Sequence, residues 1–288
     1  MAQINRSDRI LPETRWVAAL VIPFLIVAFI ILYIFPQNTE RLFAWKLQPT
    51  MSAMMLGAAY AGGIYFFTRL LLAGQWHRVK VGFLPVVTFA SLLGIATVLH
   101  WDKFNHSHIS FYAWAGLYFT TPFIILAVWL RNRSQDPDQP EARDVLIPAW
   151  VRGVIGLVGM LTLVISLFLF LKPALVISWW PWTLTPLTAR IVGAMFSLPG
   201  MVGLVMAFEV RWSAGQIILQ AQGFSILLIL VPAARAWSEF DQAKPGTWLF
   251  VGGLAAMLAG IIMFYAIVEI GGGRLKRSMV LGDTDTTE

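Results

Sequence analysis

The stretch that decides the fold of this chain occurs twice, as FAWKLQPTMSAMMLGA at residues 43–58 and as WPWTLTPLTARIVGA at residues 180–194. Pro49 and Pro186 stand at matching places in the two copies, 137 residues apart. Proline is tolerated in the first turn of a helix because the first amides there have no partner within the helix. Each copy therefore predicts a helix that begins near its proline and then presents a Gly-Ala pair on which another helix can pack closely.

The match extends outward from this motif along most of the chain. After a one-residue gap the shift becomes 136, and it then pairs Trp76 with Trp212, Trp101 with Trp237 and Phe104 with Phe240. Matches that recur at one fixed shift indicate an internal duplication. We therefore expect two halves of four helices each.

The composition places these helices in a membrane. The 288 residues are 58% hydrophobic and 12% charged, against roughly 25% charged in a soluble domain, which excludes a water-soluble globular protein and a disordered one. The chain has no Cys, which excludes disulfides and thiolate metal sites. A helix crosses a bilayer with about 20 apolar residues, and eight stretches qualify: 16–35, 50–73, 81–100, 111–130, 150–171, 186–209, 214–236 and 247–269. The predicted fold class is an all-α membrane protein with eight transmembrane helices.

Four helices per half is an even number, so both halves enter the membrane with the same orientation and form a parallel repeat. The segment SQDPDQPEARD, residues 134–144, has the polar, proline-containing composition of a linker. The expected domains are a first four-helix repeat (1–133), a cytoplasmic linker (134–146), a second four-helix repeat (147–270) and a cytoplasmic tail (271–288).

Basic residues predict the orientation, because Lys and Arg are enriched in cytoplasmic loops. With both termini in the cytoplasm, the cytoplasmic side holds Arg6, Arg9, Arg15, Arg69, Arg78, Lys80, Arg131, Arg133, Arg143, Arg152, Arg211, Arg274, Lys276 and Arg277. The outer side then holds only Arg41, Lys46, Lys103, Lys172, Arg235 and Lys244. The Trp residues fall near the ends of the predicted spans, which is typical of an anchoring belt in the headgroup regions.

The motif also carries a resemblance. WWPW followed by LTPLTAR (179–182 and 184–190), with LQPTM (47–51) in the first half, resembles an uncharacterised family of bacterial polytopic membrane proteins with a duplicated W-x-L-x-P motif at the start of a helix. The resemblance implies an eight-helix repeat and a bacterial cytoplasmic membrane. It implies no activity.

Arg190 lies within a predicted span, about one turn from its outer end, and is assigned to neither side of the membrane. A guanidinium there either extends outward to the interface or needs a partner. The candidate partners on the outer side are Asp102, Glu239 and Asp241, and such a pair would capture an anion or join the two repeats.

A cluster of His and Asp follows the third span in HWDKFNHSH, residues 100–108. His100, Asp102, His106 and His108 could surround Zn, Mn, Fe or Cu, and a metal ion here is the cofactor that the residues suggest. The alternative is a solvated loop, and a porphyrin or chlorophyll on His100 has less support.

Gln216 and Gln220 share one face of the seventh span because they are four residues apart. They indicate either hydrogen bonds between helices or the lining of a permeation path.

No Walker loop, dinucleotide fingerprint, catalytic carboxylate pair or nucleophile–base pair is recognisable. The sequence therefore favours a structural or accessory component of a membrane complex, whose partners are the lipid bilayer and other membrane subunits and not nucleic acid. The alternative is a small-solute transporter with a path between the two repeats. A metal-dependent membrane enzyme that uses the outer His cluster has less support still.

Overall fold

Eight long apolar helices dominate the part of the chain described by the computed structural model, which covers residues 6–141 and 144–282, with side chains to residue 268. Their bounds are α1 Pro12–Phe29, α3 Thr50–Leu72, α4 Phe83–Leu99, α5 Ile109–Asn132, α6 Ala149–Leu171, α8 Pro186–Phe208, α9 Trp212–Arg235 and α10 Pro245–Gly282. A π-helical turn, Ile30–Ile34, extends α1, and the short helices α2 (Thr39–Leu42) and α7 (Pro173–Ile177) lie between spans. The predicted spans are confirmed to within a few residues.

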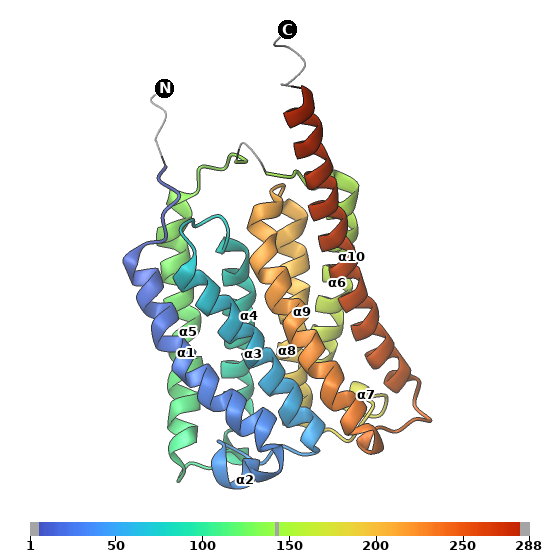
Figure 1. The fold of residues 1–288 in the computed structure, drawn as a ribbon. Coiled ribbons are helices and arrows are strands. Elements are labelled where there is room, and N and C mark those ends of the chain that lie inside the picture. The colour runs from blue at the N-terminus through green and yellow to red at the C-terminus, as the bar shows by residue number, and fades with distance from the viewer. Residues whose placement is uncertain (1–5, 142–143, 283–288) are drawn as a thin grey trace.

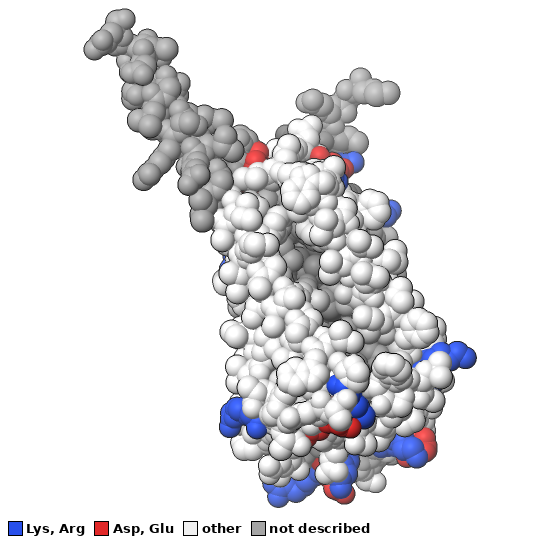
Figure 2. Space-filling model, turned by 90° about the vertical axis from the view of Figure 1, so that its right-hand side faces the viewer, with Lys and Arg blue, Asp and Glu red and all other residues white. Residues whose placement is uncertain are grey.

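The surface agrees with a multi-pass membrane protein. Each of the eight helices is long and apolar enough to cross a bilayer. Figure 2 shows the charged side chains of one face gathered at its two ends, with an apolar band between them. Lipid can cover such a band without burying charge, so the described surface implies contact with a lipid bilayer.

Four central helices join the two halves of the chain (Figure 1). α3 of the first half packs on α9 of the second, and α4 packs on α8. The other helices flank this core: α1 packs on α3, α5 on α4, α6 on α8 and α10 on α9. The central contacts therefore cross between the halves.

The start of α1 and the end of α10 lie at the same end of the bundle, together with the loop between α5 and α6 (Figure 1). We call this the termini end, and we include in it the segments 73–79, 133–141, 144–148 and 209–211. The opposite end carries α2, α7 and the loops 100–108 and 236–244. This division places the side chains discussed below.

The motif prolines stand where the sequence predicts. Pro49 is the residue immediately before α3, and Pro186 is the first residue of α8. The hydroxyl of Thr185 accepts a hydrogen bond from the amide of Thr188 and thereby satisfies one of the free donors of the first turn of α8. The Gly-Ala pairs follow within the same two helices.

Glycines bring α6 and α8 into close contact. A Cβ atom on Gly159 would lie 2.8 Å from backbone atoms of Gly200 and Gly203, closer than any side chain allows. The hydroxyl of Ser166 also donates a hydrogen bond to the carbonyl oxygen of Gly193, at 2.7 Å. Small residues therefore let this pair of helices pack backbone to backbone.

Several tryptophans are buried inside the protein and do not face lipid as an anchoring belt would. The rings of Trp45 and Trp182 are buried, with Phe104 5.0 Å from Trp45 and Phe240 5.0 Å from Trp182 between ring centroids. Trp76, Trp180 and Trp212 are buried as well. Other Trp side chains are exposed and fit the predicted belt: Trp16, Trp101, Trp150, Trp179 and Trp248.

The last helix is longer than its predicted span. α10 continues to Gly282 through residues that we assigned to the tail from position 271 onward. The end of that tail, 283–288, and residues 142–143 of the linker lie outside the described residues.

Candidate functional site

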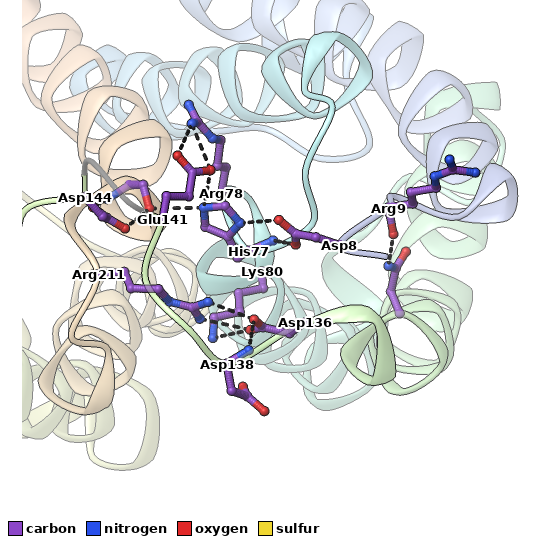
Figure 3. Close-up of polar contacts among 12 residues, drawn as sticks. Asp8, Arg9, His77, Arg78, Lys80, Asp136, Asp138, Glu141, Asp144 and Arg211 are labelled. Carbon is purple, nitrogen blue, oxygen red and sulfur yellow. Dashed lines mark hydrogen bonds and ion pairs between the residues drawn. The ribbon is translucent and has the colours of Figure 1, made fainter. Parts of the chain in front are cut away.

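Charged side chains from four separate segments converge at the termini end (Figure 3). They come from the N-terminal segment, the loop before α4, the loop between α5 and α6, and the turn between α8 and α9. We call them, together with the uncharged Ser213 at the start of α9, the ionic cluster, whose members are Asp8, His77, Arg78, Lys80, Asp136, Glu141, Asp144, Glu209, Arg211 and Ser213.

Arg211 lies at the centre of one half of the ionic cluster and is only 2% exposed. Its guanidinium donates to both carboxylate oxygens of Asp136, at 2.8 and 3.0 Å, and to both of Glu209, at 2.8 and 3.0 Å. The ammonium of Lys80 lies 2.6 Å from an oxygen of each carboxylate. Two cations thus face two anions, which is the balance that buried charge requires.

This arrangement keeps both carboxylates ionised. Burial by itself raises the pKa of Asp136, but hydrogen bonds from Arg211 and Lys80 outweigh it and hold that pKa well below its ordinary value. The same opposition lowers the pKa of Glu209 to about 2, because burial is again outweighed by Arg211 and Lys80. Both carboxylates therefore remain charged at neutral pH.

A chain of hydrogen bonds forms the other half of the ionic cluster. Asp8 Oδ2 lies 2.6 Å from His77 Nδ1, and His77 Nε2 lies 3.0 Å from the hydroxyl oxygen of Ser213. The Ser213 hydroxyl donates to Asp144 Oδ2, at 2.5 Å. Each aspartate also accepts a backbone N–H at 3.0 Å, Asp8 from His77 and Asp144 from Ser213.

The order carboxylate, imidazole, hydroxyl is also that of a hydrolytic triad, although no nucleophile–base pair was recognisable in the sequence. Two observations show why this serine is poorly placed to attack a substrate. Its hydroxyl hydrogen goes to Asp144, where the imidazole cannot remove it, and Ser213 is 7% exposed. These hydrogen bonds instead join the N-terminal segment, the linker and the start of α9.

Arg190 meets a different partner from those we expected. Its guanidinium lies 2.6 Å from Nε2 of His100, which belongs to the other half of the chain. Burial and the neighbouring Arg190 lower the pKa of His100 below its ordinary value, so the imidazole is neutral at pH 7 and can accept this hydrogen bond. Arg190 and His100 therefore connect α8 to the end of α4.

The three expected carboxylate partners lie elsewhere at the opposite end. Glu239 accepts hydrogen bonds from the hydroxyl of Thr50 and the amide of Met51, and it so caps the start of α3 from the other half of the chain. Asp102 pairs with Lys103 on the surface, and Asp241 accepts from the amide of Ala243.

The four residues of the His cluster do not form a ligand set. His100 faces Arg190, the ring of His106 lies against Trp101 and Phe111, and His108 accepts from the amide of Ser110 at the start of α5. Asp102 is paired with Lys103. Within residues 6–141 and 144–268, no group of three or more His, Cys, Asp or Glu side chains is placed to hold a metal ion.

The two glutamines of α9 lie in different surroundings. Gln220 accepts from the hydroxyl of Tyr65 on α3, at 2.6 Å, and donates to the hydroxyl of Tyr265 on α10, at 2.9 Å. It therefore joins three helices. Gln216 instead borders a cavity of about 270 Å³ at the termini end, together with Arg69 and Arg78.

Sequence reasoning missed the ionic cluster as a site, although one signal for it is present in the chain. The shift of 136 that pairs Trp76 with Trp212 also pairs His77 with Ser213 and Asp8 with Asp144. Polar residues that follow the same shift as core tryptophans are candidates for a shared structural role. Comparisons with protein-family models, with curated proteins and with solved structures find no match for this chain.

Proposed function

We propose that this protein is a structural or accessory component of a membrane complex in a bacterial cytoplasmic membrane. In this proposal it consists of two parallel four-helix repeats, both termini are cytoplasmic, and a partner subunit packs against the open face of the second repeat. The observation that carries it is a difference between α5 and α10, the last helices of the two halves.

Contacts at matching positions in the two halves support the repeats. The pairs Asp8–His77 and Asp144–Ser213 each span 69 residues and each join an amide to a carboxylate at 3.0 Å. At the opposite end, the amide of Asn105 donates to Ala44, and the amide of Asp241 donates to Pro181. An ancestral four-helix unit that was duplicated explains such paired contacts.

The distribution of basic residues supports the orientation. Arg6, Arg9, Arg15, Arg69, Arg78, Lys80, Arg131, Arg133, Arg152 and Arg211 all belong to the termini end. Since positive residues are retained in the cytoplasm, the termini end is the cytoplasmic end in this proposal.

Both ends of the bundle are tied across the two halves, which favours a rigid component over a transporter. The ionic cluster joins the halves at the termini end, and the Glu239 cap and the Arg190–His100 contact join them at the opposite end. Alternating access requires one half to move against the other. Such movement would separate buried charges from their partners, which is costly.

The first half closes around its last helix. Asn132, at the end of α5, accepts hydrogen bonds from the amide of Leu11 and the hydroxyl of Thr14 and donates to the carbonyl of Arg9. These bonds hold the start of α1 against α5. In the most apolar 18-residue stretch of this span, 33% of the residues are buried.

The second half leaves its last helix open. α10 packs on α9, and among the described residues it makes no comparable contact with α6. Only 6% of the corresponding stretch of α10 is buried. Figure 2, which views the side of the molecule that carries α6 and α10 in Figure 1, shows this face hollowed midway between its charged ends. A transmembrane helix of another subunit fits such a face, where small residues allow close packing.

Small residues line the exposed side of α10. Gly252, Gly253 and Gly260 have open space where a Cβ atom would stand, and Ala255, Ala256 and Ala259 lie between them. Gly252 corresponds by the shift of 136 to Gly116 on α5, which also faces open space. These two glycines provide a matched pair of probe positions.

Single-cysteine cross-linking in the native membrane tests the proposal, and the absence of natural Cys makes it selective. With a thiol-directed photo-cross-linker, Gly252→Cys should give one reproducible adduct with another membrane protein, and that adduct should also persist in native mass measurements in mild detergent. Gly116→Cys should give none. Equal labelling of lipid or of random proteins from both positions, with a lone monomer in detergent, would reject the accessory role.

Transport of a small solute is the second candidate, because a cavity of about 150 Å³ lies between the halves. Its walls are mainly apolar, and neither Arg190 nor Gln216 nor Gln220 is among the described residues that line it. An Arg190→Ala variant that assembles normally but loses uptake of a solute would favour transport over the structural role.

A further inference from the structure

The cavity between the two halves contains an unused hydrogen-bond donor. It lies among the spans and is lined by residues of α1, α3, α4, α5, α8, α9 and α10. Tyr60 of α3 and Tyr118 of α5 both line it, are 2% and 4% exposed, and have hydroxyl oxygens 2.6 Å apart. Two hydroxyls that share one hydrogen bond use one hydrogen, so the other is left over. Among the described residues no acceptor receives it.

A second polar atom in the same wall is also without a partner. The side-chain amide of Gln222 lines the cavity and donates to the sulfur of Met257, while its carbonyl oxygen is buried and accepts no hydrogen bond from a described residue. Buried polar groups are normally satisfied. Two unsatisfied groups in a mainly apolar wall point to a ligand that carries a polar atom.

The size and position of the cavity restrict further which ligands it can bind. An apolar cavity of about 150 Å³ accepts a molecule of the size of benzene, and this cavity has that volume. Leu254 and Met257 of α10 belong to its wall, and most of the apolar stretch of α10 is not buried by the rest of the protein. A lipid-soluble molecule can therefore approach it from the bilayer.

We propose that this cavity binds a lipid-soluble molecule of single-ring size that carries a carbonyl or a similar oxygen acceptor. The ring fills the apolar space, and the oxygen accepts the hydrogen bond that the Tyr60–Tyr118 pair has to give. The binding requires neither the ionic cluster nor a partner subunit on α10, so it can be tested independently of the accessory role.

The test compares two fluorinated probes in lipid nanodiscs by ¹⁹F NMR, with empty nanodiscs as the partition reference. 4-Fluoroacetophenone has a ring and a carbonyl, whereas 1-fluoro-4-isopropylbenzene has nearly the same shape without an acceptor. Wild-type protein should give a bound resonance for both and should bind the ketone about tenfold more tightly, since a hydrogen bond to a buried unsatisfied donor favours it by roughly that factor.

Variants of the tyrosine pair separate the hydrogen bond from the apolar space. Tyr60→Phe combined with Tyr118→Phe should remove the preference for the ketone while the hydrocarbon still binds. Tyr118→Phe alone leaves one hydroxyl free to donate and should keep the preference. Tyr112→Phe, on the lipid-facing side of α5, should behave as wild type.

Two results would overturn the proposal. One is that the wild-type protein shows no bound resonance for the ketone, or binds the ketone and the hydrocarbon equally. This result would mean that water or a lipid chain fills the cavity, and it can be obtained without any variant. The other is that the preference for the ketone survives in the folded double variant.

Discussion

The side chains of His77 and Ser213 meet at the termini end, with His77 Nε2 3.0 Å from Ser213 Oγ, although the two residues lie 136 residues apart. Both residues make the same kind of local contact: the backbone amide of each donates a hydrogen bond to an aspartate 69 residues earlier in the chain. In the proposed arrangement of two repeats, residues at equivalent positions that touch each other lie close to the axis that relates the repeats. The contact thus marks the centre of the termini end, with the ion pairs of Arg211 beside it.

Removal of Arg211 should destabilise the protein severely. Arg211→Met leaves Asp136 and Glu209 buried with only Lys80 to balance them, and breaking such a buried set costs about 3–5 kcal/mol. The measurement is thermal or denaturant unfolding in detergent. Arg131→Met is the control, because its pair with Glu13 is largely exposed and should contribute about 1 kcal/mol or less. Equal losses in the two variants would contradict this assignment.

Acid should weaken the ionic cluster over a defined range of pH. Because the folded protein depresses the pKa of Glu209 to about 2 and also lowers that of Asp136, their stabilisation is complete above the ordinary carboxyl pKa of about 4. It is lost as the pH falls from there through the folded values. The unfolding temperature should therefore decline between about pH 4 and pH 2, and Glu209→Gln should reduce the slope. A slope that the variant leaves unchanged would mean that other groups cause the decline.

Substitution of Gly159 should separate α6 from α8. Gly159→Ala places a methyl group 2.8 Å from backbone atoms of Gly200 and Gly203, which cannot move without displacing the helix. A loss of about 1–3 kcal/mol in unfolding free energy is expected for overpacking of this kind. Gly153→Ala, on the same helix with nothing near its Cβ position, should be neutral or slightly stabilising. If both variants behave alike, the close packing is not a source of stability.

Loss of the Arg190 guanidinium should change the titration of His100. Burial and then Arg190 lower the pKa of His100, so Arg190→Gln should raise that pKa toward its ordinary value. NMR titration of the imidazole signals, assigned with His100→Asn, measures the change. Arg41→Gln removes another cation at the same end that makes no contact with His100 and should leave the titration as it is. An unshifted titration in Arg190→Gln would show that the contact does not persist in the membrane.

Thiol labelling should report the orientation. Ser134→Cys lies at the termini end and Ser107→Cys at the opposite end, both at exposed positions. A membrane-impermeant maleimide should label Ser107→Cys in intact spheroplasts and Ser134→Cys only after the membrane is opened, because the basic end is retained inside. The reverse pattern would place both termini outside.

The sequence alone determined where the chain crosses the membrane. A helix of about 20 apolar residues is recognisable without knowledge of its neighbours, because the bilayer sets its length. The positions of Pro49 and Pro186 at the start of α3 and α8 follow from local backbone chemistry in the same way. The fixed shift between the halves was visible in the sequence as well, although it did not by itself single out His77 and Ser213.

Only the tertiary structure decided which polar groups meet. The sequence offered three acids for Arg190, and the structure places His100 beside it instead. It turns Trp45 and Trp182 into the protein, where composition predicted a lipid-facing belt. It also gathers Asp136, Glu209 and Arg211 from two different loops. The reason is physical: the membrane selects single helices by length and apolarity, whereas a buried charge or ring takes its partner from whichever helix packs against it, and that packing depends on the whole bundle.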